Sequence, residues 1–388
     1  MMKKIKVAQV ITRMDWGGSP DIIRLLCEGL DPAIFEVTLI TGRSTHISQA
    51  NKQFLDRFRE RTIYIEPLQR EINPLKDLRA LWKLYSIFRQ GKFDLVQTHT
   101  AKAGILGRLA ARRAGVKKIV HCSHGHNFYG YFRFWGSKLV VTIERFFDRF
   151  SDKFIALTEL EKSDLVNYRV TIASKVAVVQ SGLEIEKYHC SPDELARLKK
   201  EWSLPPAAPV VGMVSRLEPI KGPLLLVEAA KIVVPACPEV RFLVVGEGSL
   251  RRQMEQQCRE LGLAGSFIFA GWREDVEQLL AVLDILVLTS LNEAVGRIIL
   301  EAAAYGVPAV ATRVGGVPEI IKDQETGILV PPQDAGSIAN ALIELLTDRA
   351  KRERLGRAAK ARINERFSAS NMIAGVTAVY KELLKNEN

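Results

Sequence analysis

Residues 289–319 read TSLNEAVGRIILEAAAYGVPAVATRVGGVPE, and the organisation of the whole chain can be worked out from this stretch. The apolar run at 285–288, just before it, predicts a buried parallel strand. An acidic loop at Glu293 and a glycine, Gly296, then lead into a helical pattern. A strand, a glycine-bearing loop and a helix N-terminus together form an anion site, because unpaired amides and the helix dipole point at the loop.

Two carboxylates flank this predicted anion site, Glu293 on the loop and Glu301 two turns into the helix. Beside a phosphate-binding helix end, a carboxylate would accept hydrogen bonds from hydroxyl groups such as those of a ribose or a sugar. The alternative interpretation is a pair of solvated acids at the end of a helix.

The spacing of the two glutamates, with seven residues between them and Ala-x-x-x-Gly-x-Pro after the second, is specific. It resembles the donor-site signature of family 4 glycosyltransferases, which are retaining enzymes with the GT-B fold. The resemblance covers nearly the whole chain. It implies an α/β protein with two Rossmann-like, doubly wound parallel-sheet domains that face each other across a cleft. It also implies a bacterial-type enzyme of surface polysaccharide or lipid-linked glycan assembly.

Length and composition agree with two cytosolic domains. A chain of 388 residues exceeds the usual size of one domain, and a hydrophobic content of 47% can fill two cores. The five cysteines are scattered and form no Cys-x-x-Cys pair, which is typical of a reducing compartment. No run of residues is apolar for long enough to span a membrane, and the N-terminus, MMKKIKVAQVITR, predicts a first strand and not a signal peptide.

The net charge of +11 lies entirely in the first half of the chain. Residues 1–205 hold 34 Lys and Arg against 22 Asp and Glu, whereas residues 206–388 hold 21 against 22. A basic half is suited to nucleic acid, an anionic membrane surface or an acidic substrate. Because no nucleic-acid-binding module is visible, we expect no nucleic-acid partner.

Short apolar runs alternate with helical patterns along the chain, which indicates parallel sheets covered by helices. The predicted strands are 6–11, 37–41, 63–66, 95–98, 118–121, 154–157 and 176–179, then 210–214, 241–245, 267–270, 285–288, 309–311 and 328–330. The proline-rich segment 203–209 between the two sets predicts a linker. We therefore expect an N-terminal acceptor-side domain over 1–202, a donor domain over 203–370, and a helix near 371–388 that crosses back to the first domain.

Polar or glycine-bearing loops follow several predicted strands of the first half. Gly17 and Gly18 follow the first strand and permit close backbone approach, so we assign them to donor binding; the Gly-Gly pair also resembles the loop that opens the family. The loop does not fit G-x-G-x-x-G, which counts against a nicotinamide dehydrogenase. His99 and Lys102 follow a later strand and are assigned to the acceptor side, the alternative being a structural histidine and a solvated lysine.

A histidine-rich segment, HCSHGH at 121–126, follows the next strand. Three histidines so close together suggest a metal, but no acidic cluster lies nearby to complete a site. The family has a His-Gly at this place, and the resemblance implies that His124 contacts the donor sugar near the reacting carbon. Asn127 and Phe128 are assigned to the acceptor side with His99 and Lys102.

The stretch 126–150, HNFYGYFRFWGSKLVVTIERFFDRF, interleaves aromatic and basic residues. This composition suits a membrane interface or an amphipathic acceptor. A buried helix, whose phenylalanines pack on the domain, is an equal alternative, and both can be partly true.

The second half contains Arg216 and Lys221 just beyond a predicted strand, in an Arg-Leu-x-x-x-Lys-Gly motif that matches the family. The two cations can converge on one diphosphate, the arginine by its planar fork and the lysine as a point charge. Gly246, after the following strand, is placed for the nucleotide. Ala294 and Val295 stand where the family usually has Gly and Phe, so the preferred sugar cannot be carried over.

The sequence thus predicts a retaining hexosyltransferase that uses a nucleotide-diphosphate sugar, of the UDP type, and a glycan or lipid-linked acceptor. We assign His124, Glu293, Arg216 and Lys221 to catalysis. Donor binding is assigned to Gly17, Gly18, Arg216, Lys221, Gly246, Glu293, Ala294, Val295, Gly296 and Glu301. No cofactor or metal is expected, because protein cations would neutralise the leaving group. The expected location is cytoplasmic, peripheral on the inner face of the membrane. The alternatives are a nucleotide-sugar epimerase of the same fold and a non-catalytic nucleotide-sugar-binding protein.

Overall fold

The computed structural model describes residues 3–125, 128, 134–205 and 207–385. The chain divides into two compact units, Met1–Gly182 together with Ala369–Asn388 (unit 1) and Leu183–Ser368 (unit 2). The boundary therefore lies earlier than the sequence indicated, because the residues from Leu183 onward bond to the end of unit 2. The amide of Leu183 donates to the carbonyl of Phe367 at 2.8 Å, and Leu183 forms a parallel bridge with Ser368. The chain thus enters and leaves unit 2 at neighbouring positions.

Unit 1 contains a seven-stranded sheet in which every strand is parallel to its neighbours, in the order β3-β2-β1-β4-β5-β6-β7. Its strands are β1 (Ile5–Ile11), β2 (Phe35–Thr41), β3 (Thr62–Tyr64), β4 (Leu95–His99), β5 (Lys118–Cys122), β6 (Lys153–Ala156) and β7 (Val176–Val178). Its helices are α1 (Gly18–Gly29), α2 (Gln49–Arg57), α3 (Pro74–Gly91), α4 (Ala101–Ala114), α5 (Phe134–Asp148), α6 (Glu159–Asn167) and α15 (Ala369–Lys385). Two single-turn 3-10 helices, η1 (Arg59–Arg61) and η2 (Ala173–Lys175), complete it.

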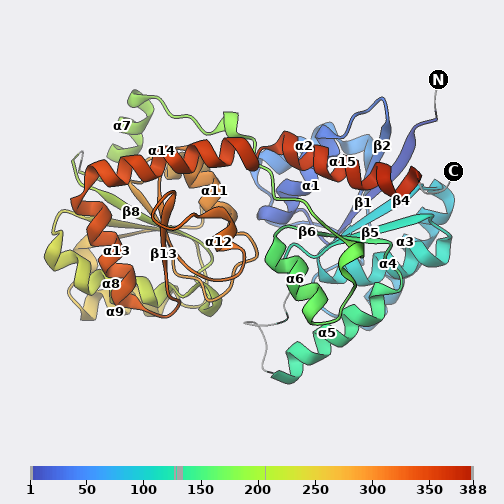
Figure 1. Ribbon diagram of the computed structural model, residues 1–388, viewed down its shortest axis with the longest axis horizontal. Coiled ribbons are helices and arrows are strands. Elements are labelled where there is room, and N and C mark those ends of the chain that lie inside the picture. The colour runs from blue at the N-terminus through green and yellow to red at the C-terminus, as the bar shows by residue number, and fades with distance from the viewer. Residues whose placement is uncertain (1–2, 126–127, 129–133, 206, 386–388) are drawn as a thin grey trace. The chain divides into compact units, whose positions relative to one another are not determined.

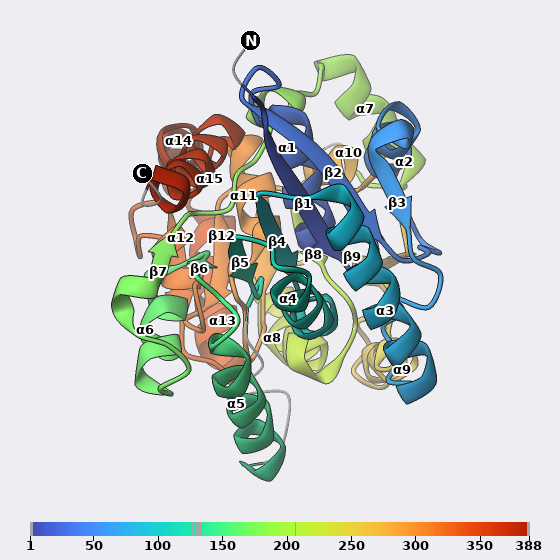
Figure 2. The ribbon, with the colours of Figure 1, turned by 90° about the vertical axis from the view of Figure 1, so that its right-hand side faces the viewer.

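Helices α3 and α4 lie side by side on one face of this sheet (Figure 2). The buried side of α3, with Ala80, Leu84 and Phe88, packs with the alanines of α4 in one core cluster. The helix begins where the Asn73 side chain accepts from the amide of Lys76 at 3.1 Å, which caps the first turn. Its opposite side is left to solvent.

Helix α15 packs in unit 1 beside α1, although it comes at the end of the chain. Its Tyr380 is fully buried and packs edge-on against Phe35 of β2 with ring centroids 5.9 Å apart. The sequence placed this crossing near residue 371, and the helix begins at Ala369.

Unit 2 contains a six-stranded parallel sheet in the order β10-β9-β8-β11-β12-β13. Figure 1 shows the helices of this unit around strands β8 and β13. Its strands are β8 (Val210–Val214), β9 (Arg241–Val245), β10 (Phe267–Gly271), β11 (Ile285–Leu288), β12 (Ala309–Thr312) and β13 (Gly327–Val330). Its helices are α7 (Pro192–Glu201), α8 (Pro223–Ala236), α9 (Arg251–Glu260), α10 (Val276–Leu280), α11 (Arg297–Ala304), α12 (Val317–Ile320), α13 (Ala335–Thr347) and α14 (Arg349–Arg366), with the 3-10 turns η3 (Ile185–Lys187), η4 (Pro219–Lys221) and η5 (Ala264–Ser266). Apolar residues of α8, α9 and α13 form one core cluster with the strands.

Every predicted strand coincides with an observed one, and both sheets are parallel and covered by helices. The predicted fold class, two Rossmann-like parallel-sheet domains, is confirmed. All five cysteines lie in the described part of the chain and are free thiols.

Candidate active site

In unit 2, the functional side chains gather where the strand order reverses. β8 and β11 are neighbours in the sheet although two strands separate them in sequence, so the connections leave in opposite directions from this point. A crevice outside the carboxyl ends of the strands is the usual ligand site at such a position. Arg216 and Lys221 follow β8, and Glu293 follows β11, so all three come from loops at this edge.

Lys221 and Glu293 form an ion pair between the Nζ atom and Oε1. Both side chains are largely enclosed, with 17% and 11% of their surface exposed. The hydroxyl of Ser290 donates to the same carboxylate oxygen at 2.8 Å, which fixes its orientation. The ammonium and the carboxylate are therefore held in place together, and Arg216 remains exposed nearby along the same loop.

The loops around this pair are bonded to one another. The hydroxyl of Thr289 donates to the carbonyl of Lys221 at 2.9 Å, and the amide of Leu291 donates to the carbonyl of Ile220 at 2.8 Å. The hydroxyl of Thr312, at the end of β12, donates to the carbonyl of Ser290 at 2.6 Å. These bonds hold the loops after β8, β11 and β12 in one rigid arrangement.

Gly315 allows the loop after β12 to approach Glu293. Its φ of 51° lies in the left-handed region, and a Cβ at this position would lie 1.7 Å from the carbonyl oxygen of Glu293. The next amide, of Gly316, donates to that same oxygen at 3.0 Å. Any side chain at residue 315 would therefore displace the Glu293 loop.

Helix α11 begins directly after this loop, with Gly296 at the N-cap in a left-handed conformation. Glu301, one of the predicted donor-binding residues, accepts from Arg297 Nε at 3.1 Å one turn earlier in the helix. Ala294 is half-buried, whereas the side chain of Val295 is only 6% exposed and packs inside unit 2. Val295 therefore contributes its backbone, and not a stacking surface, to this loop.

Gly246 brings the loop after β9 against the loop after β8. It has a φ of 135°, and a Cβ there would lie 1.9 Å from the carbonyl oxygen of Ser215, the residue before Arg216. Its amide donates to the carbonyl of Gly271 at 2.8 Å. The glycine is thus required for the close packing of these strand ends.

In unit 1, the predicted residue His124 pairs with His99. His124 Nε2 lies 2.7 Å from His99 Nδ1. Burial lowers the pKa of His124 to about 4, and burial followed by the nearby His124 lowers that of His99 well below its usual value. Both imidazoles are therefore neutral near pH 7, and one proton must lie between them.

A buried chain of hydrogen bonds determines which nitrogen carries that proton. Tyr380 of α15 donates to Gln97 Oε1 and accepts from Gln9 Nε2 at 2.8 Å, which leaves Gln9 Oε1 facing His99 Nε2 at 2.7 Å. An amide oxygen only accepts, so His99 Nε2 donates, its Nδ1 accepts, and His124 Nε2 is the donor between the rings. His124 Nδ1 is then an acceptor, and it has no partner among the described residues.

Glu161, in the first turn of α6, supports the loop that carries His124. It accepts from the hydroxyl of Ser123, from the amide of Gly125 at 3.2 Å and from the amide of Leu157 at 2.7 Å. His124 itself has a φ of 56°, an uncommon conformation for a residue with a side chain. The glutamate thus stabilises a strained turn that presents the imidazole.

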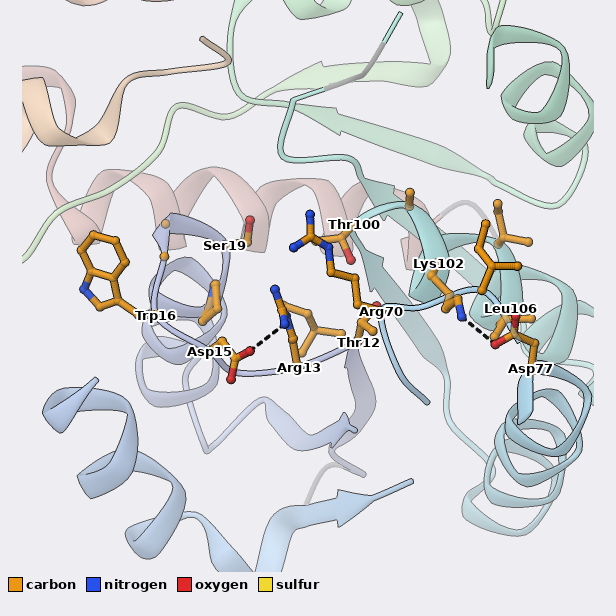
Figure 3. A pocket seen from close by; sticks show the side chains of 17 residues that line it. Thr12, Arg13, Asp15, Trp16, Ser19, Arg70, Asp77, Thr100, Lys102 and Leu106 are labelled. Carbon is orange, nitrogen blue, oxygen red and sulfur yellow. Dashed lines mark hydrogen bonds and ion pairs between the residues drawn. The ribbon is translucent and has the colours of Figure 1, made fainter. Parts of the chain in front are cut away.

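A cavity of about 650 Å³ opens at the ends of β1 and β4 in the same unit (Figure 3). Gly17, Gly18 and Lys102, three of the predicted site residues, line it. Lys102 forms an ion pair with Asp77 of α3 at 2.7 Å, and Arg13 forms one with Asp15 at 2.9 Å. With Arg70, which also lines the cavity, the structure brings together cations from the loops after β1 and β3 and from the start of α4, of which the sequence singled out only Lys102.

The three described residues of those assigned to the acceptor side do not form one group. Among these three, only Lys102 lines the cavity; His99 is fully buried in the histidine pair. Phe128 is 3% exposed and belongs to a core cluster with Val141 and Phe154. Asn127 lies outside the described residues. His99 thus orients His124, and Phe128 packs in the core of unit 1.

The aromatic and basic stretch at 126–150 divides between core and surface. Phe128 and Val141 are buried, while Trp135, Leu139 and Phe146 of α5 are 75%, 61% and 48% exposed. Residues 126–127 and 129–133 of this stretch lie outside the described part. The described part of the stretch is therefore partly core and partly surface, and its contact with a membrane stays a prediction.

One group of side chains within the described ranges has the spacing of a metal site. Ligand atoms of His99, Cys122 and His124 lie within 4.8 Å of one another. Burial raises the pKa of the Cys122 thiol, which disfavours the thiolate that a metal requires. The two imidazoles already hydrogen bond to each other, so this cluster gives a metal little support. The absence of a metal from the reaction stays a prediction.

Several positioning residues were not identified from the sequence. Gln9, Gln97 and Tyr380 come from β1, β4 and α15, and no local motif marks them. Arg13 and Arg70 were also missed, although Arg13 follows the first strand and could have been found from that position.

Comparisons with known proteins give a consistent result for both units. Residues 16–187 match the model of glycosyltransferase family 4, and residues 196–362 match the model of glycosyl transferases group 1. A UDP-Gal:alpha-D-GlcNAc-diphosphoundecaprenol alpha-1,3-galactosyltransferase of Escherichia coli is 30% identical over 349 residues, which are 89% of each chain. A D-inositol 3-phosphate glycosyltransferase of Streptomyces bingchenggensis is 29% identical over 76% of this chain and 68% of the relative.

Solved structures share the fold along the whole chain. Anabaena HepE in complex with UDP and glucose superposes with a TM-score of 0.84 at 23% identity, covering 97% of this chain and 100% of that one. Sucrose-phosphate synthase of Thermosynechococcus elongatus gives a TM-score of 0.81 at 23% identity, covering 99% and 100%.

Proposed function

This chain belongs to the family 4 glycosyltransferases, with the GT-B fold, and from that premise we propose that it transfers a hexose from a UDP-sugar to a lipid-linked acceptor. The UDP of the donor is supported by the name of the Escherichia coli relative and by the UDP bound in the Anabaena structure. The acceptor class is supported by that relative's acceptor, a diphosphoundecaprenol-linked sugar.

The observation that carries this proposal is the enclosed pair of Lys221 and Glu293 at the strand ends of unit 2. In our proposal, Lys221 and the exposed Arg216 bind the diphosphate. Glu293 accepts hydrogen bonds from the sugar hydroxyls, and Glu301 accepts from the ribose. The amides at the start of α11 add positive potential on the same side.

During transfer, the bond between the anomeric carbon and the diphosphate oxygen breaks, and a bond to the acceptor oxygen forms. UDP leaves with the electron pair and an extra negative charge, and the proton of the acceptor hydroxyl passes to the departing diphosphate or to solvent. Cations fixed before the reaction stabilise this charge without reorganisation, which is the largest single contribution in many enzymes. We propose that the transfer retains the anomeric configuration and needs no metal ion, since Lys221 and Arg216 neutralise the leaving group.

His124 is proposed to accept a hydrogen bond from a hydroxyl of the reacting sugar. Its Nδ1 is the unpartnered acceptor of the histidine pair, and burial keeps the ring neutral. A neutral acceptor can orient a hydroxyl without adding charge beside the anomeric carbon.

A peripheral position on the inner face of the cytoplasmic membrane is the proposed location, where the enzyme takes part in surface polysaccharide assembly. The basic charge of the first half and the exposed Trp135 and Leu139 of α5 support it. In the part of the chain that the structure describes, no helix combines the length and the apolar character needed to cross a bilayer.

The proposal is tested by incubating the protein with UDP-glucose, UDP-galactose and UDP-N-acetylglucosamine, with and without a short-chain prenyl-diphosphate-linked N-acetylglucosamine. We expect one donor to yield UDP and a lengthened acceptor, whose new linkage keeps the donor's anomeric configuration by NMR. Conversion of the donor without acceptor into another UDP-sugar would indicate an epimerase. A donor present at 100 times its Kd should raise the free energy of unfolding by about 2.7 kcal/mol, and with it the melting temperature. If none of the three donors raises the melting temperature, the donor assignment is wrong.

A further inference from the structure

The cavity of unit 1 combines a cationic part with an apolar part. Arg13, Arg70 and Lys102 reach it from the loops after β1 and β3 and from the start of α4, while Ile72, Ile105 and Leu106 provide apolar surface. Figure 3 shows the labelled side chains of Arg13, Arg70 and Lys102 on the cavity walls, with Leu106 beyond Lys102. A ligand that fits this cavity has an anionic group and an apolar group.

The cations of the cavity exceed its carboxylates by one. Arg13 is paired with Asp15, and Lys102 with Asp77. Arg70 is exposed and has neither an ion-pair nor a hydrogen-bond partner among the residues that the structure describes. Its guanidinium offers the planar fork of donors that binds phosphate oxygens in a bidentate manner. The cavity therefore favours a phosphate or diphosphate.

The apolar side of the cavity continues along the solvent-facing side of α3, which we call the α3 face. Leu75, Leu78 and Trp82 lie at helical spacing on it and are 74%, 53% and 65% exposed, and Ile72, two residues before the helix, extends the face and is 88% exposed. Exposed basic side chains of the same helix lie next to them, namely Lys76, Arg79 and Lys83. Ile72 belongs both to the cavity lining and to this face, so the two features are continuous.

Apolar side chains beside basic ones are suited to an anionic lipid surface. The apolar groups enter the interface, and the lysines and arginines lie at the level of the phosphates. A second copy of this chain fits poorly, because self-association through the α3 face would bring like charges together. Charge complementarity therefore favours a membrane as the occupant.

We propose that the cavity binds the diphosphate of a lipid-linked acceptor and that the α3 face contacts the membrane holding its lipid chain. This inference rests on the proposed function, of which it specifies the acceptor and the place where the acceptor binds. Arg70 binds the diphosphate oxygens directly. Arg13 and Lys102 neutralise less of the diphosphate charge, because each is already paired with an aspartate. The lipid chain leaves past Ile72 toward Leu75 and Trp82.

The diphosphate part is tested by the binding of farnesyl diphosphate to the full-length protein in saturating UDP, which occupies the donor site. We expect the wild type to bind and Arg70→Gln to bind about tenfold or more weakly, because one charge-assisted contact is lost. Arg113→Gln, an exposed arginine at the other end of α4, is the matched control and should bind like the wild type. Inorganic diphosphate should bind more weakly than farnesyl diphosphate.

The outcomes separate this inference from the proposed function. If the wild type binds UDP but not farnesyl diphosphate, or if Arg70→Gln binds it normally, the inference is wrong and the donor assignment stands. Inorganic diphosphate binding as tightly as farnesyl diphosphate would indicate a soluble phosphorylated acceptor and overturn the lipid assignment. A wild type that binds no UDP would overturn the proposed function, and this inference with it.

The membrane part is tested by co-sedimentation with vesicles of phosphatidylcholine, with and without phosphatidylglycerol. We expect the wild type to sediment with the anionic vesicles and the double variant Leu78→Ser/Trp82→Ser to do so about tenfold less, since apolar burial is lost. Both substituted residues are exposed, so the fold should be preserved, which thermal unfolding verifies. Trp135→Ser on α5 tests the other exposed apolar segment of unit 1, and Ile232→Ser, an exposed apolar residue of α8 in unit 2, is the matched control that should bind like the wild type. Binding that is lost in Trp135→Ser and kept in the double variant would overturn the assignment to the α3 face.

Discussion

In unit 2 the loops after β8, β9, β11 and β12 are bonded directly to one another, whereas in unit 1 the loops after β1, β3 and β4 surround a cavity of about 650 Å³. Lys221 is paired with Glu293, whose carboxylate also accepts a hydrogen bond from Ser290. Arg70 is exposed and unpaired among the described residues. A rigid site whose charged side chains are paired is suited to a ligand group of constant structure, such as a nucleotide diphosphate. An open site with an unpaired cation can accept a larger ligand with an apolar part.

The largest expected effect is the loss of a cation from the rigid site. Lys221→Ala, or Arg216→Ala, should lower kcat by about a hundredfold or more, because fixed charge no longer stabilises the leaving diphosphate. Steady-state UDP release measures it. Lys231→Ala, an exposed lysine of α8 in the same unit, is the control and should keep full activity. Normal turnover in both active-site variants, with intact circular dichroism, would refute the donor assignment.

A second prediction tests whether close packing in unit 2 is necessary. Gly315→Ala should lower kcat by on the order of tenfold to a hundredfold, because its Cβ would overlap the carbonyl oxygen of Glu293 and move the carboxylate. Gly265→Ala is the matched control, since no atom lies within 4 Å of its added Cβ. Equal activity in the two variants would show that the position of the Glu293 loop is not critical.

The third prediction concerns the neutral histidines of unit 1. His124 has a folded pKa of about 4, below the value of 6.5 for an unperturbed histidine, so between these pH values the unfolded chain binds a proton that the folded chain does not. This contribution to the free energy of unfolding is therefore complete above about pH 6.5 and is lost as the pH falls toward 4. Its size is on the order of 3 kcal/mol. Urea unfolding of the wild type and of His124→Gln across this range should give a flatter pH dependence in the variant.

A smaller effect should follow from shortening the hydrogen-bond chain behind the histidines. Tyr380→Phe should lower the free energy of unfolding by about 1–3 kcal/mol, since the buried Gln9 and Gln97 lose a partner. It should lower kcat less than Lys221→Ala does and leave the affinity for UDP unchanged. Tyr85→Phe on α3 controls for the general effect of removing a tyrosine hydroxyl. A loss of UDP affinity in Tyr380→Phe would contradict the separation of the two units' roles.

The smallest expected effect is that of metal removal. Activity should be unchanged by EDTA, because Lys221 and Arg216 supply the positive charge at the diphosphate. Turnover is measured before and after dialysis against the chelator. Complete loss of activity that magnesium or manganese restores would show that the protein cations are insufficient.

The sequence predicted what depends on local patterns. The strands of both sheets could be found from short apolar runs, and Arg216, Lys221 and Glu293 could be found because each follows such a run. The domain boundary was misplaced, because it depends on the contact of Leu183 with the Phe367–Ser368 segment and not on the prolines at 203–209. Gln9 and Tyr380 are hydrogen bonded although 371 positions separate them, which no local pattern could reveal.

The difference between the two units is tested most directly by isothermal titration of UDP into the wild type, Lys221→Ala and Arg70→Gln. Unit 2 holds the proposed diphosphate site, so Lys221→Ala should bind UDP about tenfold or more weakly, as expected for one lost charge-assisted contact. Arg70→Gln should bind UDP with the affinity of the wild type. Weak binding in Arg70→Gln together with normal binding in Lys221→Ala would contradict the account, because it would place the nucleotide in unit 1.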